Sequence, residues 1–132
     1  MGLQEKGLPT ALREYIFEWE NRNDTRVQFA ARNERRLPLD IEQAIYRITQ
    51  EALANVARHS QARRVDLSLV YNGDSLQLSL ADDGHGFDMQ TKPRGMGLRS
   101  IRERTSSVRG TVQIQSAPGQ GTRIIVQVPI KG

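Results

Sequence analysis

Apolar residues recur at helical spacing near the start of the chain, at Leu8, Leu12, Ile16 and Trp19. Steps of four, four and three positions place these side chains on one face of a helix, which we expect from about residue 9 to residue 20. A polar turn should follow it. Residues 27–31 are then predicted to form a short strand.

A second and longer apolar stripe follows Asp40, which we expect to cap a helix together with Gln43 in a capping-box arrangement. The helix is predicted to end near His59. Its buried face should consist of the apolar positions Ile41, Ala44, Ile45, Ile48, Ala52, Leu53 and Val56, which follow the helical period.

The second half of the chain alternates apolar and polar residues as strands do. Alternation over residues 65–69 and 76–80, with Asn72-Gly73 between them, predicts a hairpin. Residues 98–108 are expected to form a third helix that ends with Gly110 in the left-handed conformation. Two final strands are predicted, around residues 112–114 and over 122–129.

Three helices and about five mostly antiparallel strands predict an α+β fold, a two-layer sandwich with the helices on one face of the sheet. The length of 132 residues suits a single domain. We expect residues 8–132 to form this domain, and residues 1–7 to be a linker or an added remnant.

Composition narrows the possible functions. The chain has no cysteine, which excludes a disulfide framework, a thiolate zinc site and a cysteine nucleophile, and the cytoplasm is the expected location. No apolar run is long enough to span a membrane. The net charge of +4 favours an anionic partner, but aromatic residues make up only 5% of the chain, which disfavours single-stranded nucleic acid.

The second helix carries a polar strip at Glu51, Asn55 and His59, four residues apart, with Arg58 beside it. Such a strip is commonly a solvated helix face. Asn55, however, is a poor helix former in the middle of a helix, and an amide oxygen is a good ligand for Mg²⁺. Asn55 is therefore a candidate magnesium ligand.

A second candidate site is the loop Asp82-Asp83-Gly84-His85-Gly86-Phe87, directly after a predicted strand. It could be a simple Asp-Gly turn. Its glycines also allow close approach to a ligand, and an ionised Asp82 could accept a hydrogen bond from the exocyclic amine of adenine. Guanine presents an oxygen at that position, so Asp82 would favour ATP over GTP.

Two further glycine pairs lie downstream. Gly95-Met96-Gly97-Leu98 precedes a predicted helix, and the free N–H groups of a helix N-terminus favour phosphate, although a steric reason for these glycines is equally open. The segment lacks the Lys-Ser/Thr of a P-loop. Gly119-Gln120-Gly121-Thr122 alone is typical of a tight turn between strands.

The order of these four motifs resembles the GHKL superfamily of ATPases, which includes gyrase, heat-shock chaperone ATPases and histidine kinases. Residues 48–59 and 95–104 are most similar to short sensor histidine kinases of the nitrate-sensor and desaturase-sensor type. The resemblance implies an ATP-binding fold of the Bergerat type. It spans about residues 8–130.

The resemblance also implies roles for individual residues. Asn55 would bind Mg²⁺ and Glu51 could orient or deprotonate a nucleophile, while Asp82 would hold the adenine amine. The remaining expected ATP-binding residues are Arg58, His59, Gly84, Gly86, Phe87, Gly95, Met96, Gly97, Leu98 and Thr122. Asp83 stands where the family often has Asn, so we expect this departure to be tolerated and Asp83 to be partly structural.

The function implied is the catalytic half of a two-component histidine kinase. Such a domain passes the γ-phosphoryl group of Mg-ATP to a histidine on a separate dimerisation domain, for relay to a response regulator. The chain's two histidines, His59 and His85, both lie in ATP-site motifs, so an isolated, monomeric catalytic domain without nucleic-acid or membrane contacts is expected. The alternatives are an anti-sigma-factor type serine kinase and a catalytically silent nucleotide- or nucleic-acid-binding module.

Overall fold

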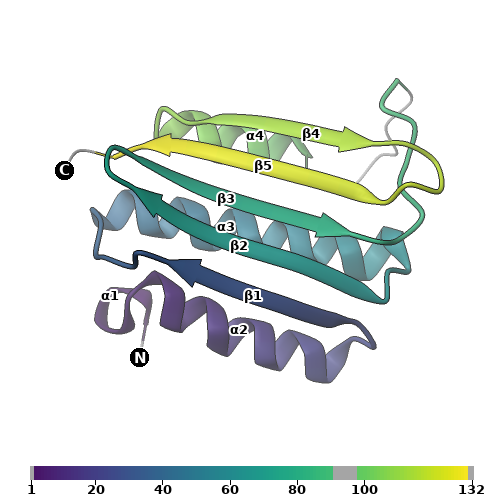
Figure 1. The fold of residues 1–132 in the computed structure, drawn as a ribbon, viewed down its shortest axis with the longest axis horizontal. Helices are drawn as coiled ribbons and strands as arrows, with labels where there is room; N and C mark the ends of the chain where they lie inside the picture. The colour runs from purple at the N-terminus through teal and green to yellow at the C-terminus, as the bar shows by residue number, and fades with distance from the viewer. Residues whose placement is uncertain (1, 91–97, 131–132) are drawn as a thin grey trace.

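The computed structural model describes residues 2–90 and 98–130. Five strands form one sheet in the order β1-β2-β3-β5-β4, and the helices cover one of its faces (Figure 1). The expected two-layer α+β sandwich is confirmed. No helix within these residues is long and apolar enough to cross a bilayer.

The helical layer follows the two apolar stripes. Helix α2 (Leu8–Arg22) buries Leu8, Leu12, Ile16 and Trp19, as its spacing predicts. Helix α3 (Leu39–Asn55) is central and continues into a π-helical turn, η1 (Val56–Ser60). Helix α4 (Leu98–Ser107) packs beside α3, and a short helix, α1 (Leu3–Lys6), precedes α2.

The sheet combines one parallel and three antiparallel pairings. Strand β1 (Arg26–Arg32) runs parallel to β2 (Arg64–Asn72). Strand β2 forms the predicted hairpin with β3 (Ser75–Asp82), which pairs with β5 (Thr122–Pro129), and β5 pairs with the edge strand β4 (Thr111–Ser116). Parallel pairing of β1 and β2 requires a crossover, which α3 provides.

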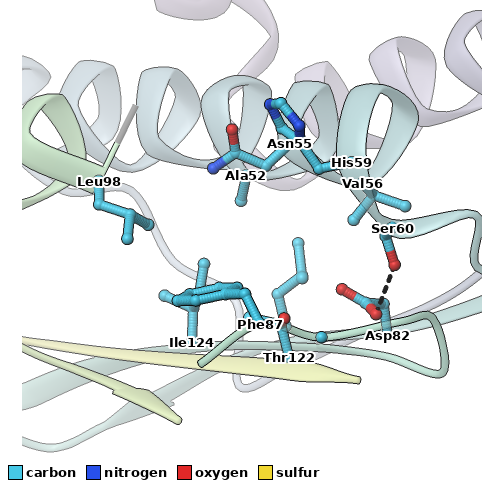
Figure 2. A pocket seen from close by; sticks show the side chains of 12 residues that line it. Ala52, Asn55, Val56, His59, Ser60, Asp82, Phe87, Leu98, Thr122 and Ile124 are labelled. Carbon is cyan, nitrogen blue, oxygen red and sulfur yellow. Dashed lines mark hydrogen bonds between the residues drawn. The ribbon is translucent and has the colours of Figure 1, made fainter. Parts of the chain in front are cut away.

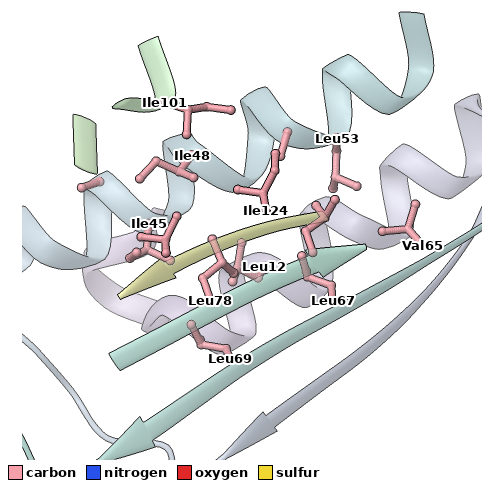
Figure 3. Packing of buried hydrophobic residues seen from close by; sticks show 14 of the residues in the cluster. Leu12, Ile45, Ile48, Leu53, Val65, Leu67, Leu69, Leu78, Ile101 and Ile124 are labelled. Atoms are coloured by element: carbon pink, nitrogen blue, oxygen red, sulfur yellow. The ribbon is translucent and has the colours of Figure 1, made fainter. Parts of the chain in front are cut away.

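The hydrophobic core lies between the helices and the sheet (Figure 3). Alternate residues of β2 and β3 point toward α3, so that the apolar face of the hairpin is buried and its polar face is not. Among the fully buried side chains are Ile45, Ile48, Leu53, Leu67, Leu69, Leu78, Leu80 and Ile101. The core thus fixes α3 along the middle of the sheet.

Two predicted local features differ from the structure near α3 and the hairpin. The N-cap of α3 lies two residues earlier than expected, at Pro38 and without a side-chain cap, so Asp40 lies inside the first turn. There its charge still complements the helix dipole. The hairpin turn is formed by Gly73 and Asp74, because Asn72 pairs with Ser75 as the last residue of the ladder.

The end of α4 also differs from the prediction. The left-handed residue is Arg109, with a φ of 62°, and not Gly110. Gly110 donates to the carbonyl of Thr105 and Arg109 to that of Ser106, both at 2.9 Å, which is the Schellman arrangement with Arg109 as the C′ residue.

Candidate functional site

A cavity of about 130 Å³ separates the C-terminal end of α3 and η1 from the ends of β3 and β5 (Figure 2). It is partly open and mainly apolar, with a few polar side chains directed into it, which is typical of a small-molecule site. Its lining comprises Ala52, Asn55, Val56, His59, Ser60, Leu80, Asp82, Gly86, Phe87, Leu98, Thr122 and Ile124.

The sheet wall of the cavity follows from strand register. Asp82 ends β3 and Thr122 begins β5, and the two are cross-strand partners in the antiparallel ladder. Leu80 and Ile124 pair in the same way two residues further into the sheet and lie on the same face. A carboxylate and a hydroxyl are thereby placed at the rim of an apolar floor.

Asn55 and His59 form the polar part of the helical wall. Asn55 is buried, with 6% exposure. Neither its amide nitrogen nor its amide oxygen has a partner among the described residues, and the same is true of Nε2 of His59. Buried polar atoms without partners are costly, so unpaired groups that line a cavity indicate a ligand that supplies the missing partners.

Asp82 faces these groups from the sheet side. Its Oδ1 accepts two hydrogen bonds, from Oγ of Ser60 at 2.7 Å and from the backbone N–H of Gly84 at 2.8 Å. The other carboxylate oxygen points toward the cavity in Figure 2. This oxygen is available as a hydrogen-bond acceptor.

The glycines of the loop after β3 are required by close packing. A Cβ on Gly84 would lie 1.8 Å from Oγ of Ser60, and one on Gly86 would lie 2.2 Å from the carbonyl oxygen of Ala117. Gly86 and Gly121 also have positive φ, and a Cβ on Gly121 would lie 2.1 Å from the carbonyl oxygen of Asp82. The loops after β3 and before β5 are therefore packed against each other.

Ser116, at the end of β4, connects these two loops. Its Oγ accepts a hydrogen bond from the backbone N–H of Phe87 at 2.8 Å, lies 2.8 Å from Oγ1 of Thr122 and donates to the carbonyl of Gly121 at 3.0 Å. Phe87 is thereby held with its buried ring against the cavity.

Asp83 and His85 are exposed and lie outside the lining of the cavity. The carboxylate of Asp83 accepts hydrogen bonds from the backbone N–H groups of Arg63 and Arg64, at 2.8 and 3.1 Å. These bonds, first that of Arg64 and then that of Arg63, lower the pKa of Asp83 below its usual value. Nε2 of His85 is 2.8 Å from the amide oxygen of Gln61.

Not every predicted site residue reaches the cavity. Glu51 and Arg58 lie outside its lining and form an ion pair at 3.5 Å on the flank of the helix. Gly95, Met96 and Gly97 lie outside the described residues, although Leu98, which follows them, lines the cavity.

Several lining residues were missed by the sequence analysis. Ser60 is the polar residue in this group. Its position could have been predicted from spacing, because residues 52, 56 and 60 are four apart and continue one helical stripe into the cavity. Leu80 and Ile124 were recognisable as strand residues on the same face of the sheet as Asp82 and Thr122. Their part in the cavity depended on the pairing of β3 with β5, which sequence alone did not specify.

Comparison with known proteins agrees with this geometry. Residues 40–132 match the family described as histidine kinase-, DNA gyrase B- and HSP90-like ATPase (HATPase_c). The chain is 36% identical over 129 residues to the sensor histidine kinase LiaS of Bacillus subtilis, covering 97% of this chain and 36% of LiaS. It is 33% identical over 131 residues to the sensor protein VraS of Staphylococcus aureus, covering 98% of this chain and 38% of VraS.

Solved structures show the same fold at low sequence identity. The histidine kinase domain of the Erythrobacter litoralis blue-light activated kinase EL346 superposes with a TM-score of 0.75 at 18% identity, over 93% of this chain and 61% of that one. The Acinetobacter baumannii histidine kinase AdeS gives a TM-score of 0.71 at 16% identity, over 96% and 65%.

The family match includes both walls of the cavity, from the helix that carries Asn55 to the strand that begins at Thr122. The chain spans little more than a third of the length of LiaS and VraS. The superfamily expected from the four motifs is confirmed: this chain belongs to the histidine kinase-, DNA gyrase B- and HSP90-like ATPase family.

Proposed function

We propose that this chain is the ATP-binding catalytic domain of a two-component sensor histidine kinase, which transfers the γ-phosphoryl group of Mg-ATP to a histidine on a separate dimerisation domain. One observation carries the proposal: the unpaired buried groups of Asn55 and His59 face an available oxygen of Asp82 across a mostly apolar cavity. A nucleotide has the matching chemistry, a flat apolar base with polar edges joined to an anionic tail.

The sheet wall fits the base. We infer that the available oxygen of Asp82 accepts a hydrogen bond from the exocyclic amine of adenine, and that Thr122 supports the same end. Phe87, Leu80 and Ile124 supply the apolar surface. Gly84 and Gly86 let the loop after β3 pack closely against Ser60 and Ala117, so that the loop leaves the cavity free for the base.

The helical wall fits the phosphates. In Figure 2, Asn55 and His59 lie on the helical wall between Ser60 at one end of the cavity and Leu98 at the other. Leu98 is the first residue of α4, and free N–H groups at a helix N-terminus favour anions. We infer that Gly95, Met96 and Gly97, which directly precede this helix in the sequence, meet the phosphates. Arg58, half exposed beside the cavity, adds positive charge.

The residues present fit a magnesium ion that enters with the nucleotide. The amide oxygen of Asn55 is an unpaired oxygen ligand, the kind of atom that Mg²⁺ binds. No cluster of three His, Asp or Glu side chains within the described residues could hold a metal alone, so phosphate oxygens and water would complete its coordination. When bound, the ion neutralises charge on the transferring phosphoryl group.

Glu51 is suited to act on a group that arrives from outside the chain. It is half buried on the flank of α3, where it forms an ion pair with Arg58, and it does not line the cavity. We propose that it orients or deprotonates the incoming nucleophile. Because LiaS and VraS extend well beyond the part that this chain matches, we place the acceptor histidine in another domain, a response regulator downstream, and the domain itself in the cytoplasm with its ATP.

The test is magnesium-dependent nucleotide binding. Asn55→Ala should reduce Mg-ATP affinity roughly tenfold to a hundredfold in titration calorimetry, since it removes contacts to charged groups, and should abolish most of the affinity gained on adding Mg²⁺. The matched control is Gln43→Ala, which removes an exposed carboxamide from the other end of the same helix and should bind as the unmodified chain does. Unchanged Mg-ATP binding by Asn55→Ala would contradict the assignment.

The acceptor is tested by the chemistry of the phosphorylated product. A full-length kinase that contains this domain, incubated with radiolabelled ATP, should form a phosphate bond that is lost in acid and stable in base, as phosphohistidine is. An acid-stable bond would identify a serine kinase instead.

A further inference from the structure

Ser60 lies outside all four motifs, yet it contacts Asp82, the residue proposed to hold adenine. It is the last residue of η1, and its side chain is buried, with 7% exposure. Its hydroxyl donates to Oδ1 of Asp82 at 2.7 Å, the typical length for a hydrogen bond between a hydroxyl and a carboxylate. The end of the helical wall is thus bonded directly to the sheet wall (Figure 2).

This bond determines which carboxylate oxygen is free. Oδ1 accepts from Ser60 and from the N–H of Gly84, so both of its contacts are to the protein. The torsion that rotates a carboxylate has a broad, shallow energy profile, and two donors from different directions hold it in one orientation. The second oxygen is consequently presented to the cavity in a fixed position.

Ser60 is itself held from both sides. Its carbonyl accepts a hydrogen bond from the backbone N–H of His85 at 2.8 Å. Gly84 approaches so closely that a Cβ there would lie 1.8 Å from the Ser60 hydroxyl. The hydroxyl therefore has little freedom to turn away from Asp82.

We propose that Ser60 is a positioning residue that sets the preference of this site for a base with an exocyclic amine. The inference rests on the proposed function, because it assumes that Asp82 accepts from adenine. Ser60 does not touch the base. It removes the rotational freedom of Asp82 before the nucleotide binds, a preorganisation that increases affinity without a new contact to the ligand.

The experiment compares ATP with purine riboside triphosphate, which lacks only the exocyclic amine, by calorimetry on the same chain. Ser60→Ala should weaken ATP binding about five- to tenfold. This is less than the full loss of a hydrogen bond to a charged group, because the Ser60–Asp82 bond lies within the protein and the nucleotide loses only the ordering of Asp82. Binding of purine riboside triphosphate should remain within twofold. An equal loss for both nucleotides would show that Ser60 only supports the fold, and would overturn the inference.

Three further variants control for a purely structural effect. Ser60→Cys keeps the approximate shape with a weak donor and should show a partial loss for ATP alone. Thr49→Val removes a fully buried hydroxyl of α3 that bonds to the carbonyl of Ile45; it should lower stability and leave the ratio of the two affinities unchanged. In the Asp82→Asn background, Ser60→Ala should add less than a twofold loss for ATP, since the carboxylate that it positions is gone.

The outcomes separate the two proposals. If the unmodified chain binds neither nucleotide, the proposed function fails and the inference fails with it. If the unmodified chain prefers ATP and the Ser60 variants keep the same preference, the proposed function stands and the role of Ser60 is refuted.

Discussion

At the scale of single residues, Arg109 is in a conformation that suits glycine. Its φ of 62° places a long side chain in the left-handed region, where an L-residue with a Cβ is about 1–2 kcal/mol less stable. The Schellman bonds around it require this geometry whichever residue occupies the position. Arg109 therefore carries local strain, and its side chain forms no ion pair with any of the described residues that would offset it.

Arg109→Gly should accordingly increase the free energy of unfolding by about 0.5–1 kcal/mol, which is the relieved strain less the greater freedom of glycine in the unfolded chain. Urea denaturation followed by circular dichroism measures the change. The control is Arg104→Gly, in the last turn of the same helix, where the backbone is right-handed and glycine should lower the free energy of unfolding by up to about 1 kcal/mol. A loss of stability in Arg109→Gly would show that its side chain makes a contact worth more than the strain.

We expected Gly110 to be the left-handed C′ residue because glycine is the commonest residue at that position. In the structure a glycine is needed at position 110 for a steric reason instead. A Cβ on Gly110 would lie 2.7 Å from the carbonyl oxygen of Gln127 and 3.0 Å from a methyl group of Thr105, so the side chain is excluded by the approach of β5 and α4. A steric requirement from distant residues is not visible in local sequence.

At the scale of elements, Asp83 joins two segments that are remote in sequence. Its carboxylate accepts the N–H groups of Arg63 and Arg64, where β2 begins, and its own N–H donates to the carbonyl of Arg64. The start of β2 is thereby fixed to the end of β3, close to the loop that carries Gly84 and Gly86. Its expected structural role agrees with these contacts.

Asp83 should make part of the stability depend on pH. Its pKa is lowered in the folded chain, so its contribution is complete above the ordinary value of 3.8 and is lost as pH falls through the lower folded value. We expect Asp83→Asn to be less stable than the unmodified chain at pH 7, with the difference shrinking below about pH 4. Chemical denaturation at a series of pH values measures it.

The control for this prediction is Asp66→Asn on the same strand, β2. Asp66 pairs with the side chain of Arg64, and both side chains are more than half exposed. An exposed pair of this kind contributes about 0–1 kcal/mol, so Asp66→Asn should change stability little at pH 7. A gap between the unmodified chain and Asp83→Asn that stays constant down to pH 3 would show that the carboxylate charge is not what matters.

Elements with one buried face were predictable from sequence, since burial on one face produces a clear period. The stripe of α3 and the alternation of β2 and β3 are examples. The π-helical turn η1 was not predicted. It comes directly after α3 and ends at Ser60, whose hydroxyl is bonded to Asp82 and whose carbonyl is bonded to His85. The spacing of residues 52, 56 and 60 indicates a helix, but it does not reveal the hydrogen bonds that accompany the π-helical turn.

At the scale of the whole molecule, the motifs were recognisable but their meeting point was not fully determined. Asp82 and Thr122 meet because β3 and β5 are neighbours, although α4 and β4 lie between them in the chain. Asn55 and His59 face them because α3 is packed along the middle of the sheet. Among the polar residues singled out from the sequence, Asn55, His59, Asp82 and Thr122 line the cavity. Strand order and helix packing decide that Glu51 and Arg58 lie outside it.

Helix α3 is anchored at its opposite end by a buried charge. Glu42 is fully buried, and its carboxylate accepts hydrogen bonds from Nε and Nη2 of Arg36, at 3.3 and 3.2 Å, and from the N–H of Leu37 at 3.3 Å. Arg36 also donates to the carbonyl of Gln4, at 2.8 Å. One guanidinium thus joins the N-terminal helix α1, the segment before α3, and α3 itself.

Removal of Arg36 should destabilise the whole domain, because it leaves Glu42 as a buried carboxylate without a counter-charge. We expect Arg36→Ala to lower the free energy of unfolding by about 2–3 kcal/mol. This is less than the 3–5 kcal/mol typical of a fully buried pair, because the Arg36 side chain is 55% exposed and water can replace part of its interaction with Glu42. Arg99→Ala, which breaks an ion pair with Glu103 whose side chains are 91% and 66% exposed, should cost less than about 0.5 kcal/mol. Urea denaturation of both variants measures the difference. Equally small losses of unfolding free energy in the two variants would mean that Glu42 is stabilised without Arg36. Because α3 ends at Asn55 and leads directly into η1, which carries His59, a domain loosened at Arg36 should also bind Mg-ATP less tightly. The Arg99 variant should bind Mg-ATP as the unmodified chain does.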